Sequence, residues 1–276
     1  MRNNYNNSTR NNYRRTVSGN KEDRTAKAND WLEELIKKYK DPVQYAVDHT
    51  MSVKHRNGVS EIIKGNLKEL PIFEINMPDT ITRIFKNDVV TCARAAVTHA
   101  TQGDRVCVLN YASYTSPGGG FLKGSTAQEE SLCFSTGLYY CLVDHMDWYN
   151  MHKEEKHDFV YSDDYIYSKD VPFIVNGKIY KIDVLTMAAP NYARAAVPVN
   201  DAMEQRMRVA YELPAKHGAN ILLLGAWGCG VFGNETDFVA STWKSLSEEH
   251  DGWYKEIVHP IIDNENYKTF RKVYGI

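Results

Sequence analysis

The sequence of 276 residues predicts an α/β fold, a layered sandwich built around a mixed sheet. From about residue 72 onward, strand-like and helix-like patterns alternate along the chain. Two of the strand-like stretches, 105–111 and 221–226, are short continuous apolar runs, which are typical of strands buried on both faces. Each run leads into a glycine-rich loop. Both loops are therefore expected at the carboxyl ends of strands, where sheets of this class bind ligands.

The bulk composition is that of an ordinary globular protein and excludes several classes. Lys and Arg number 33 against 35 Asp and Glu, so the chain lacks the global basic field with which proteins hold nucleic acid. No apolar run is long enough to span a bilayer, and no signal-peptide pattern follows the first residues. The five cysteines form no C-x-x-C pair, which favours free thiols in a reducing compartment. The sequence predicts an intracellular, cytoplasmic protein with no membrane partner.

Three regions are expected along the chain. Residues 1–27 are rich in Asn and Arg and bury too little apolar surface to fold, so a disordered tail is predicted there. Residues 28–70 are predicted to form a helical extension packed on the core. Asp30 and Glu33 have the spacing of a capping box, Asp41-Pro42 is expected to end this helix, and a second helix follows to about Met51. Residues 71–276 are predicted to form the main domain.

The main domain alternates between the two periodicities. Strands are expected at 81–90, 105–111, 159–168, 171–175, 180–188, 221–226 and 257–262, and helices at 89–100, 127–143, 201–216, 236–246 and 267–274. Asn176-Gly177 is a strong signal for a tight hairpin turn between two of these strands. The polar stretch 144–157 is expected to leave the core as an excursion.

The most informative stretch runs from Pro117 to Glu130. Its three adjacent glycines, Gly118, Gly119 and Gly120, strip side chains from a loop, so a ligand can approach bare backbone N–H groups. An amide and two carboxylates follow, which suits a phosphate-bearing sugar ligand with an acid beside it. The stretch is not a P-loop, because its lysine precedes the last glycine, and it does not fit the dinucleotide-binding G-x-G-x-x-G pattern.

These residues resemble the signature of the microbial-type poly(ADP-ribose) glycohydrolase family, in which three glycines are followed after several residues by Gln-Glu-Glu. Here the glycines are residues 118–120, the spacer is 121–127 and the Gln-Glu-Glu triplet is 128–130. Further matching blocks are 108–113, 131–132 with 135–139, 224–234 and, more weakly, 188–191, so the resemblance covers roughly residues 81–276. Cys133-Phe134 departs from the family, which commonly has a more polar or basic pair at that place.

The resemblance implies a three-layer α/β/α macrodomain-like sandwich that hydrolyses the ribose–ribose O-glycosidic bonds of poly(ADP-ribose) without a metal or a cofactor. The family's catalytic acid corresponds to Glu130, and Glu129 corresponds to a residue that contacts ribose hydroxyls and orients the scissile sugar. Breaking the bond gives the anomeric carbon oxocarbenium character, and the departing oxygen needs a proton. Glu130 is expected to donate that proton and then to deprotonate the incoming water.

The expected substrate-binding residues lie in or beside the two glycine-rich loops. In the family, the second loop holds the diphosphate, an aromatic residue packs on a ribose, and an Asn at a strand end reaches the ribose next to the scissile bond. The corresponding residues are Asn110, Gly118, Gly119, Gly120, Gln128, Gly228, Cys229, Gly230, Val231, Phe232 and Asn234, with Asp88 where macrodomains often place an adenine-binding acid. A nucleophilic role for Cys229 is not expected, because no partner histidine is evident.

Several of these features also have purely structural interpretations. Adjacent carboxylates at a helix start complement the helix dipole, glycines make tight strand–helix turns, and an Asn at a strand end satisfies backbone groups. The histidines and acids between residues 144 and 157 fit no metal-binding spacing, so no metal site is expected.

Two alternative functions remain open, because a fold alone does not determine activity. One is an ADP-ribose reader without turnover, and the other is a hydrolase of mono-ADP-ribosylated protein or nucleic acid. The expected partners are poly(ADP-ribose) or ADP-ribosylated macromolecules, with ADP-ribose as the product, and the protein is expected to be a monomer.

Overall fold

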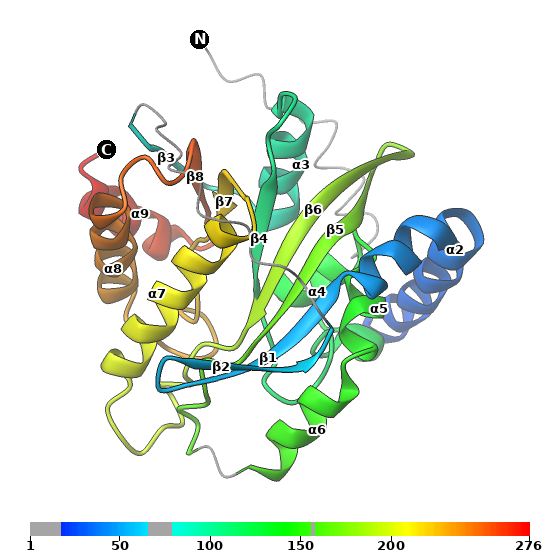
Figure 1. Ribbon diagram of the computed structural model, residues 1–276, viewed down its shortest axis with the longest axis horizontal. Helices are drawn as coiled ribbons and strands as arrows, with labels where there is room; N and C mark the ends of the chain where they lie inside the picture. Colours follow the sequence, from blue (N-terminus) through cyan, green and yellow to red (C-terminus); the bar gives the residue numbers. More distant parts are fainter. Residues whose placement is uncertain (1–17, 66–78, 156–157) are drawn as a thin grey trace.

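The computed structural model describes residues 18–65, 79–155 and 158–276. Within these residues, eight strands form one mixed sheet with helices on both of its faces (Figure 1), which confirms the predicted three-layer sandwich. The strands are β1 (Thr50–Arg56), β2 (Val59–Lys64), β3 (Ile81–Phe85), β4 (Val106–Tyr111), β5 (Tyr165–Val175), β6 (Lys178–Met187), β7 (Ile221–Leu223) and β8 (Glu256–Pro260). Their order in the sheet is β2-β1-β5-β6-β4-β7-β8-β3, and the pairs from β6 to β3 are parallel.

The helices divide into two layers. They are α2 (Lys21–Asp48), α3 (Val89–His99), α4 (Gln128–Cys133), α5 (Leu138–Val143), α6 (Met146–Glu154), α7 (Asn200–Lys216), α8 (Thr236–Glu249) and α9 (Asn264–Tyr274), with the 3₁₀ helix η1 (Phe121–Lys123). One hydrophobic cluster joins the sheet to α7, α8 and α9, and a second joins it to α2, α3, α4, α5 and α6 (Figure 1). In the described part of the chain, no helix is both long enough and apolar enough to cross a membrane.

The central strands match their sequence-based expectations. All residues of β4 except Tyr111 are buried, and so is the whole of β7, because parallel strands in a three-layer fold are covered on both faces. Asn176 and Gly177 adopt positive φ angles of 51° and 75° and connect β5 to β6, as the Asn-Gly signal predicts. β5 joins residues 165–168 of the strand expected at 159–168 to the strand expected at 171–175, with an irregularity between Ser168 and Val171, whereas residues 159–164 are not a strand.

The N-terminal helix differs from its prediction in both its start and its course. It begins at Lys21, so residues 21–27 are helical rather than part of a disordered tail, and residues 1–17 lie outside the described residues. The capping box is formed by Asn20 and Asp23 and not by Asp30 and Glu33. Pro42 does not end the helix, which continues to Asp48 through a kink at Tyr39. Such a kink accommodates the ring and the missing N–H of a proline three residues later.

The prediction that residues 28–70 form a helical extension is wrong for residues 50–64. These residues form the hairpin β1–β2. β1 pairs antiparallel with β5, so the hairpin extends the main sheet instead of capping it. The turn is Asn57-Gly58, with φ angles of 53° and 76°, the same turn chemistry as Asn176-Gly177. The expected domain boundary near residue 70 falls in the segment 66–78, outside the described residues.

The long helix expected at 127–143 is two short helices, α4 and α5. The break occurs because residues 135–137 bond to β5: Ile174 N–H donates to Ser135 O, and Gly137 N–H donates to Pro172 O. A Cβ on Gly137 would lie 2.8 Å from the Pro172 ring, so this close approach requires glycine. The polar stretch 144–157 contains α6, whose Trp148, Tyr149 and His152 side chains are buried.

Candidate active site

The first glycine loop follows β4 and leads into α4, which places the adjacent carboxylates of Glu129 and Glu130 beside it. Gly119 has a φ of +60°, and a Cβ on it would lie 2.7 Å from Glu130 Oε1 and 3.0 Å from Glu129 Oε2. Gly118 is also left-handed, with a φ of +66°. The loop therefore needs glycine both for its backbone conformation and to let the two carboxyl groups approach.

The N–H groups of this loop point into the protein. Gly120 N–H donates to Glu130 Oε1 at 2.8 Å, and Gly119 N–H donates to Ser116 O at 3.0 Å. The backbone of the loop thus holds the Glu130 carboxyl through Gly120, which the sequence motif does not reveal.

Glu130 has one carboxyl oxygen fixed and one unpaired. Oε1 accepts the Gly120 bond, while Oε2 is buried and has no hydrogen-bond partner among the described residues. Buried polar atoms in native proteins nearly always have a partner, so this oxygen is available to a group that the described residues do not supply.

Glu129, in contrast, has both oxygens engaged by the protein. Oε1 accepts from Asn110 Nδ2 at 3.2 Å, and Oε2 accepts from the Ser113 N–H at 2.8 Å. Burial, opposed by these hydrogen bonds and reinforced by the neighbouring Glu130, raises the pKa of Glu129 to about 8. The Glu129 carboxyl is therefore mainly protonated at neutral pH.

Asn110 and Gln128 join α4 to β4. Asn110 is fully buried, and its Nδ2 also donates to Thr186 Oγ1 at 3.2 Å, whereas its Oδ1 has no partner within the described ranges. Gln128 accepts from the Tyr111 N–H at 2.9 Å and donates to Leu109 O at 2.8 Å. Gln128 lines the cavity described below, but its polar atoms extend the hydrogen bonding of β4, so its main visible role is to fix the first turn of α4.

The second glycine loop follows β7 and is closed by Asn234. The Asn234 side chain donates to Pro190 O at 2.7 Å and to Gly228 O at 3.2 Å, and its N–H donates to the same Gly228 carbonyl. Gly228 has a φ of +74°, and a Cβ there would lie 2.5 Å from the Asn234 amide. Gly230 has open space where a Cβ would stand, and Val231 is 90% exposed, so the middle of the loop is accessible.

Cys229 sits between these glycines as a packed thiol. Its Sγ donates weakly to Trp227 O at 3.6 Å, and burial raises the pKa of the thiol to about 12. A thiol that resists ionisation is a poor nucleophile, which agrees with its expected place as a loop residue.

A cavity of about 320 Å³ opens at the carboxyl ends of the parallel strands. Its lining includes five predicted loop residues, namely Gln128, Gly228, Gly230, Val231 and Phe232. The lining also includes Pro260 at the end of β8, the residues 261–263 that follow it, and Val89 and Asn266 in the first turns of α3 and α9. These residues belong to neither glycine-rich loop, so the sequence motifs did not indicate them. The available sequence signal is that Asp263, a helix-capping residue type, directly follows a predicted strand end.

Asp88 caps α3 instead of facing the cavity with a free carboxylate. Oδ1 accepts from the Thr91 N–H at 2.8 Å, and Oδ2 accepts from Thr91 Oγ1 at 2.7 Å. Its neighbour Val89 contributes to the lining. These contacts show that Asp88 is the N-cap of α3. The adenine-binding role expected for it stays a prediction.

Phe232 is supported by an aromatic residue that no motif indicates. The Tyr161 ring lies 6.1 Å from the Phe232 ring and stacks on Tyr114 at 4.4 Å. Tyr161 has a φ of +64°, which is rare for a bulky side chain. Buried Arg206 holds the adjoining segment by donating to Asp163 Oδ1, Val160 O and Ala188 O. This arrangement is tertiary, so no local sequence signal precedes it.

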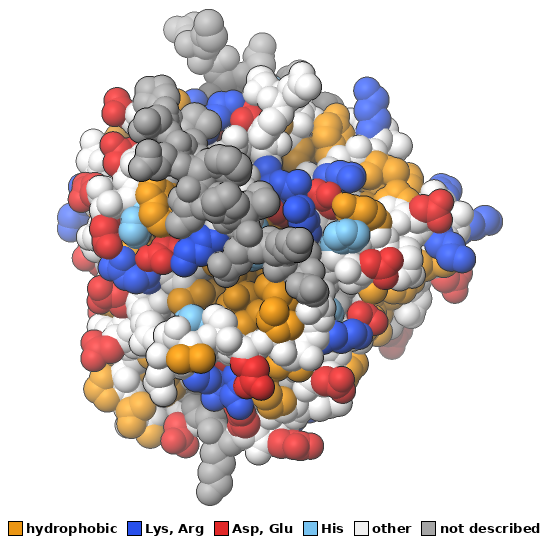
Figure 2. Space-filling view, in the orientation of Figure 1, with side chains coloured by type: hydrophobic (Ala, Val, Ile, Leu, Met, Phe, Trp, Pro, Cys, Tyr) orange, Lys and Arg blue, Asp and Glu red, His pale blue; other side chains and the backbone are white. Residues whose placement is uncertain are grey.

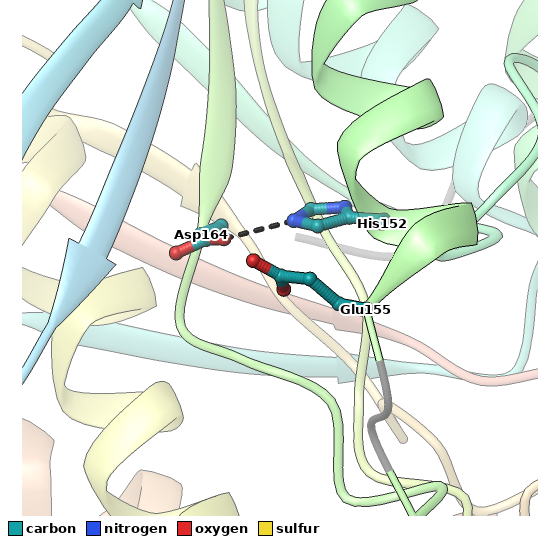
Figure 3. A group of neighbouring side chains, drawn as sticks. All are labelled: His152, Glu155 and Asp164. Carbon is teal, nitrogen blue, oxygen red and sulfur yellow. Dashed lines mark hydrogen bonds and ion pairs between the residues drawn. The ribbon is translucent and has the colours of Figure 1, made fainter.

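His152, Glu155 and Asp164 form a polar cluster (Figure 3). Arg56 Nη2 lies 2.6 Å from Asp164 Oδ2 and 2.8 Å from Glu155 Oε2, and His152 Nε2 lies 2.8 Å from Asp164 Oδ2. Although burial opposes it, hydrogen bonding from Arg56 and His152 holds the pKa of Asp164 well below its usual range. A guanidinium thus supplies the positive charge at these carboxylates, and the cluster ties the β1–β2 hairpin to α6.

Comparisons with known proteins agree with this geometry. The model of the catalytic domain of microbial-type poly(ADP-ribose) glycohydrolase (PARG) matches residues 14–176, more than half of the chain. The PARG of Thermomonospora curvata superposes with a TM-score of 0.75 at 28% identity, covering 91% of this chain and 99% of that chain. Its structure bound to the inhibitor ADP-HPD gives the same values.

A second bacterial enzyme is also similar. The PARG of Deinococcus radiodurans in complex with ADP-ribose has a TM-score of 0.62 at 30% identity, covering 70% of this chain and 84% of that chain. A search of curated proteins finds no match. From the matched catalytic-domain model and these neighbours, the chain belongs to the microbial-type poly(ADP-ribose) glycohydrolase family, whose members are glycosidases.

Proposed function

We propose that this protein hydrolyses poly(ADP-ribose) and releases ADP-ribose, with Glu130 as the general acid and base. The observation that carries the role of Glu130 is its Oε2 atom, which is buried and unpaired among the described residues while Oε1 is fixed by Gly120 N–H. A catalytic carboxyl needs this combination of a fixed orientation and one oxygen available to the substrate. The corresponding atoms of Glu129 are both occupied by Asn110 and Ser113.

The site has separate features for each part of an ADP-ribose unit. The cavity of about 320 Å³, largely walled by apolar side chains, suits the adenine ring. The accessible backbone of Gly230 and Val231 suits the diphosphate, which exposed N–H groups bind well. The distal ribose is then placed against Phe232 and the two glutamates. Asn110 Oδ1, buried and unpaired in the part of the chain that is described, is a further acceptor for a ribose hydroxyl.

The reaction follows from these placements. Glu130 Oε2–H protonates the departing ribose oxygen as the glycosidic C–O bond breaks, and positive charge develops on the anomeric carbon. The resulting Glu130 carboxylate then takes a proton from the water that attacks this carbon, which restores the acid. Glu129, kept neutral by burial, orients the scissile ribose without adding a second negative charge beside the diphosphate.

Regions outside this site are not expected to select the substrate by charge alone. Lys and Arg are interspersed with Asp and Glu over the face shown in Figure 2, and the formal net charge is −2. Recognition of the anionic polymer is therefore assigned to the loops and the cavity. The monomeric state, the cytoplasmic location and the identity of the modified macromolecule stay predictions.

A release assay tests the proposal. Labelled poly(ADP-ribose) and a mono-ADP-ribosylated protein are incubated side by side with the wild-type protein and with Glu130→Gln, which keeps the side-chain shape but has no acidic proton. The expected result is release of ADP-ribose from the polymer by the wild type and a fall of about 100-fold or more in the variant.

Each other outcome contradicts a defined part of the proposal. Retention of intact polymer by the wild type indicates a reader without turnover, and release from the mono-modified protein alone indicates a mono-ADP-ribosyl hydrolase. Near-normal polymer hydrolysis by Glu130→Gln excludes Glu130 as the acid. Binding of ADP-ribose to the variant, measured by calorimetry, separates lost chemistry from lost binding.

A further inference from the structure

The start of α2 lies directly against the loop that follows the three glycines. Arg24 Nε donates to Gly124 O at 2.7 Å across 100 residues of sequence. Gly124 has a φ of +72°, and the carbonyl of Lys21 stands where a Cβ on Gly124 would be. The first turn of α2 and this loop therefore pack backbone against backbone, with no room for a side chain between them.

A short series of hydrogen bonds leads from Arg24 to the Glu130 carboxyl. The peptide group that joins Gly124 to Ser125 accepts from Arg24 through its oxygen and donates through its N–H to Gly120 O at 3.0 Å. Gly120 in turn donates its own N–H to Glu130 Oε1 at 2.8 Å. Ser125 Oγ occupies the place of a Cβ on Gly120, so this residue has little freedom to move.

Other contacts hold the same region from inside. Phe121 is buried, with its ring 4.7 Å from that of Phe134. Trp31, two turns further along α2, donates its Nε1–H to Cys133 O in α4 at 2.9 Å. The helix α2 thus contacts both the loop that orients Glu130 and the helix that carries it.

We propose that Arg24 is a positioning residue for Glu130, acting through the Gly124–Ser125 peptide and Gly120. It contacts no substrate. Its guanidinium fixes the peptide group that closes the loop, and this fixes the N–H donor that orients the catalytic carboxyl. Small displacements of a catalytic group lower turnover steeply, because the proton must be delivered along one direction. The inference rests on the proposed role of Glu130 as acid, and it gives residues 21–27 a part in catalysis.

The test compares Arg24→Met with a matched control, Tyr140→Phe. Tyr140 OH donates to Leu32 O at 3.0 Å, so each substitution removes one partly buried hydrogen bond between α2 and the core. Only Arg24 is connected to the catalytic loop. The expected result is a fall in kcat of about tenfold or more for Arg24→Met with the affinity for ADP-ribose little changed. Tyr140→Phe is expected to keep kcat while losing a similar amount of thermal stability.

Hydrogen exchange measured by mass spectrometry supplies a second readout that needs no activity. Peptides that cover residues 117–130 should exchange faster in Arg24→Met than in Tyr140→Phe, because the loop loses one of its anchors. Arg24→Lys, which keeps the charge and an N–H donor, should recover part of the rate. Equal kcat values in Arg24→Met and the wild type overturn the proposal, as do equal losses in both variants or unchanged exchange of the loop. If the wild type releases no ADP-ribose, the proposed function has failed instead, and the exchange experiment still decides whether Arg24 supports the loop.

Discussion

Asn110 Nδ2, at the end of β4, donates a hydrogen bond to Glu129 Oε1 in the first turn of α4, and the two side chains are both buried. With the Ser113 N–H on the other oxygen, this bond fixes Glu129 inside the protein. Burial and these hydrogen bonds, rather than solvent, therefore determine the pKa of the Glu129 carboxyl.

Because the pKa of Glu129 is raised to about 8, the affinity for ADP-ribose should depend on pH. Above pH 8 the Glu129 carboxyl loses its proton, and a new negative charge appears close to Glu130 and to the expected diphosphate position. The ligand is anionic, so its binding should weaken by up to about tenfold per pH unit above this value. Calorimetric titration between pH 6.5 and 9.5 measures the effect. Glu129→Gln should give a flat profile, and equal slopes for the two proteins would contradict the assignment.

Gly119→Ala should strongly reduce turnover without unfolding the protein. The added Cβ would lie 2.7 Å from Glu130 Oε1 and would displace that carboxyl, which should cost about 100-fold in rate. Gly177→Ala is the matched control, since Gly177 also has a positive φ, 75° against 60°, but has open space at its Cβ position. Both variants should lower the melting temperature because of the positive φ, and Gly119→Ala should lower it further because of its clash with the buried carboxyl groups. The idea fails if Gly177→Ala loses as much activity as Gly119→Ala.

A large side chain at Gly230 should block the ligand without disturbing the apo protein. The described residues leave open space around this position, and its φ is not in the left-handed region, so Gly230→Trp carries little strain. ADP-ribose should raise the melting temperature of the wild type and of Gly230→Ala by mass action, but not that of Gly230→Trp. An undiminished thermal shift in the tryptophan variant would remove this loop from the ligand site.

His259 should make stability fall as the solution becomes acidic. Burial lowers the pKa of His259 to about 3, and its Nδ1 accepts a hydrogen bond from Gly225 N–H at 3.2 Å. The unfolded chain takes up a proton near pH 6.5 and the folded chain does not, so between about pH 6.5 and 3 this residue contributes roughly 1.4 kcal/mol per pH unit of lost stability. Above pH 6.5 His259 is neutral in both the folded and the unfolded chain, so none of this stability is lost there.

His259→Gln isolates that contribution, because glutamine keeps an acceptor for Gly225 N–H but does not titrate. The difference in unfolding free energy between wild type and variant, measured by urea denaturation at pH 7.5, 6.0 and 5.0, should change in favour of the variant as pH falls. A difference that is independent of pH would show that His259 is not the responsible group.

The sequence predicts those elements whose local chemistry determines their geometry. The apolar run that became β4 and the Asn176-Gly177 turn fall into this group, because burial and positive φ are encoded in the residues themselves. Asn57-Gly58 carries the same turn signal, with φ angles of 53° and 76°. A helical extension was nevertheless predicted for this region, because the residues before it have helical periodicity and the Asn-Gly pair was not given the same weight.

The parts that could not be predicted depend on contacts between distant segments. The sequence contains two capping-box patterns with equivalent chemistry, at Asn20 and at Asp30. Only the earlier one starts α2, and Ala28 between them is buried against the core. The triplet 128–130 indicates the expected site residues. It does not reveal that Gln128 bonds to the β4 backbone or that Tyr161 stacks beside Phe232, since both relations are tertiary.

The hydrogen bonds that join α2 to the core also set an order for folding. Arg24, Trp31 and Leu32 meet partners that lie 100, 102 and 108 positions away along the chain. A ribosome that adds roughly 5–20 residues per second would release α2 about 5 to 20 seconds before Gly124 and Tyr140. The partners of α2 lie in the first glycine loop, α4 and α5, so α2 should dock only after these segments have formed on the sheet. The glycine loop, which Arg24 anchors, should be among the last parts to become rigid. Pulse-labelled hydrogen exchange during refolding should show amides of α2 and of residues 117–130 gaining protection together and after those of β4. Protection of α2 before β4 would reverse this order.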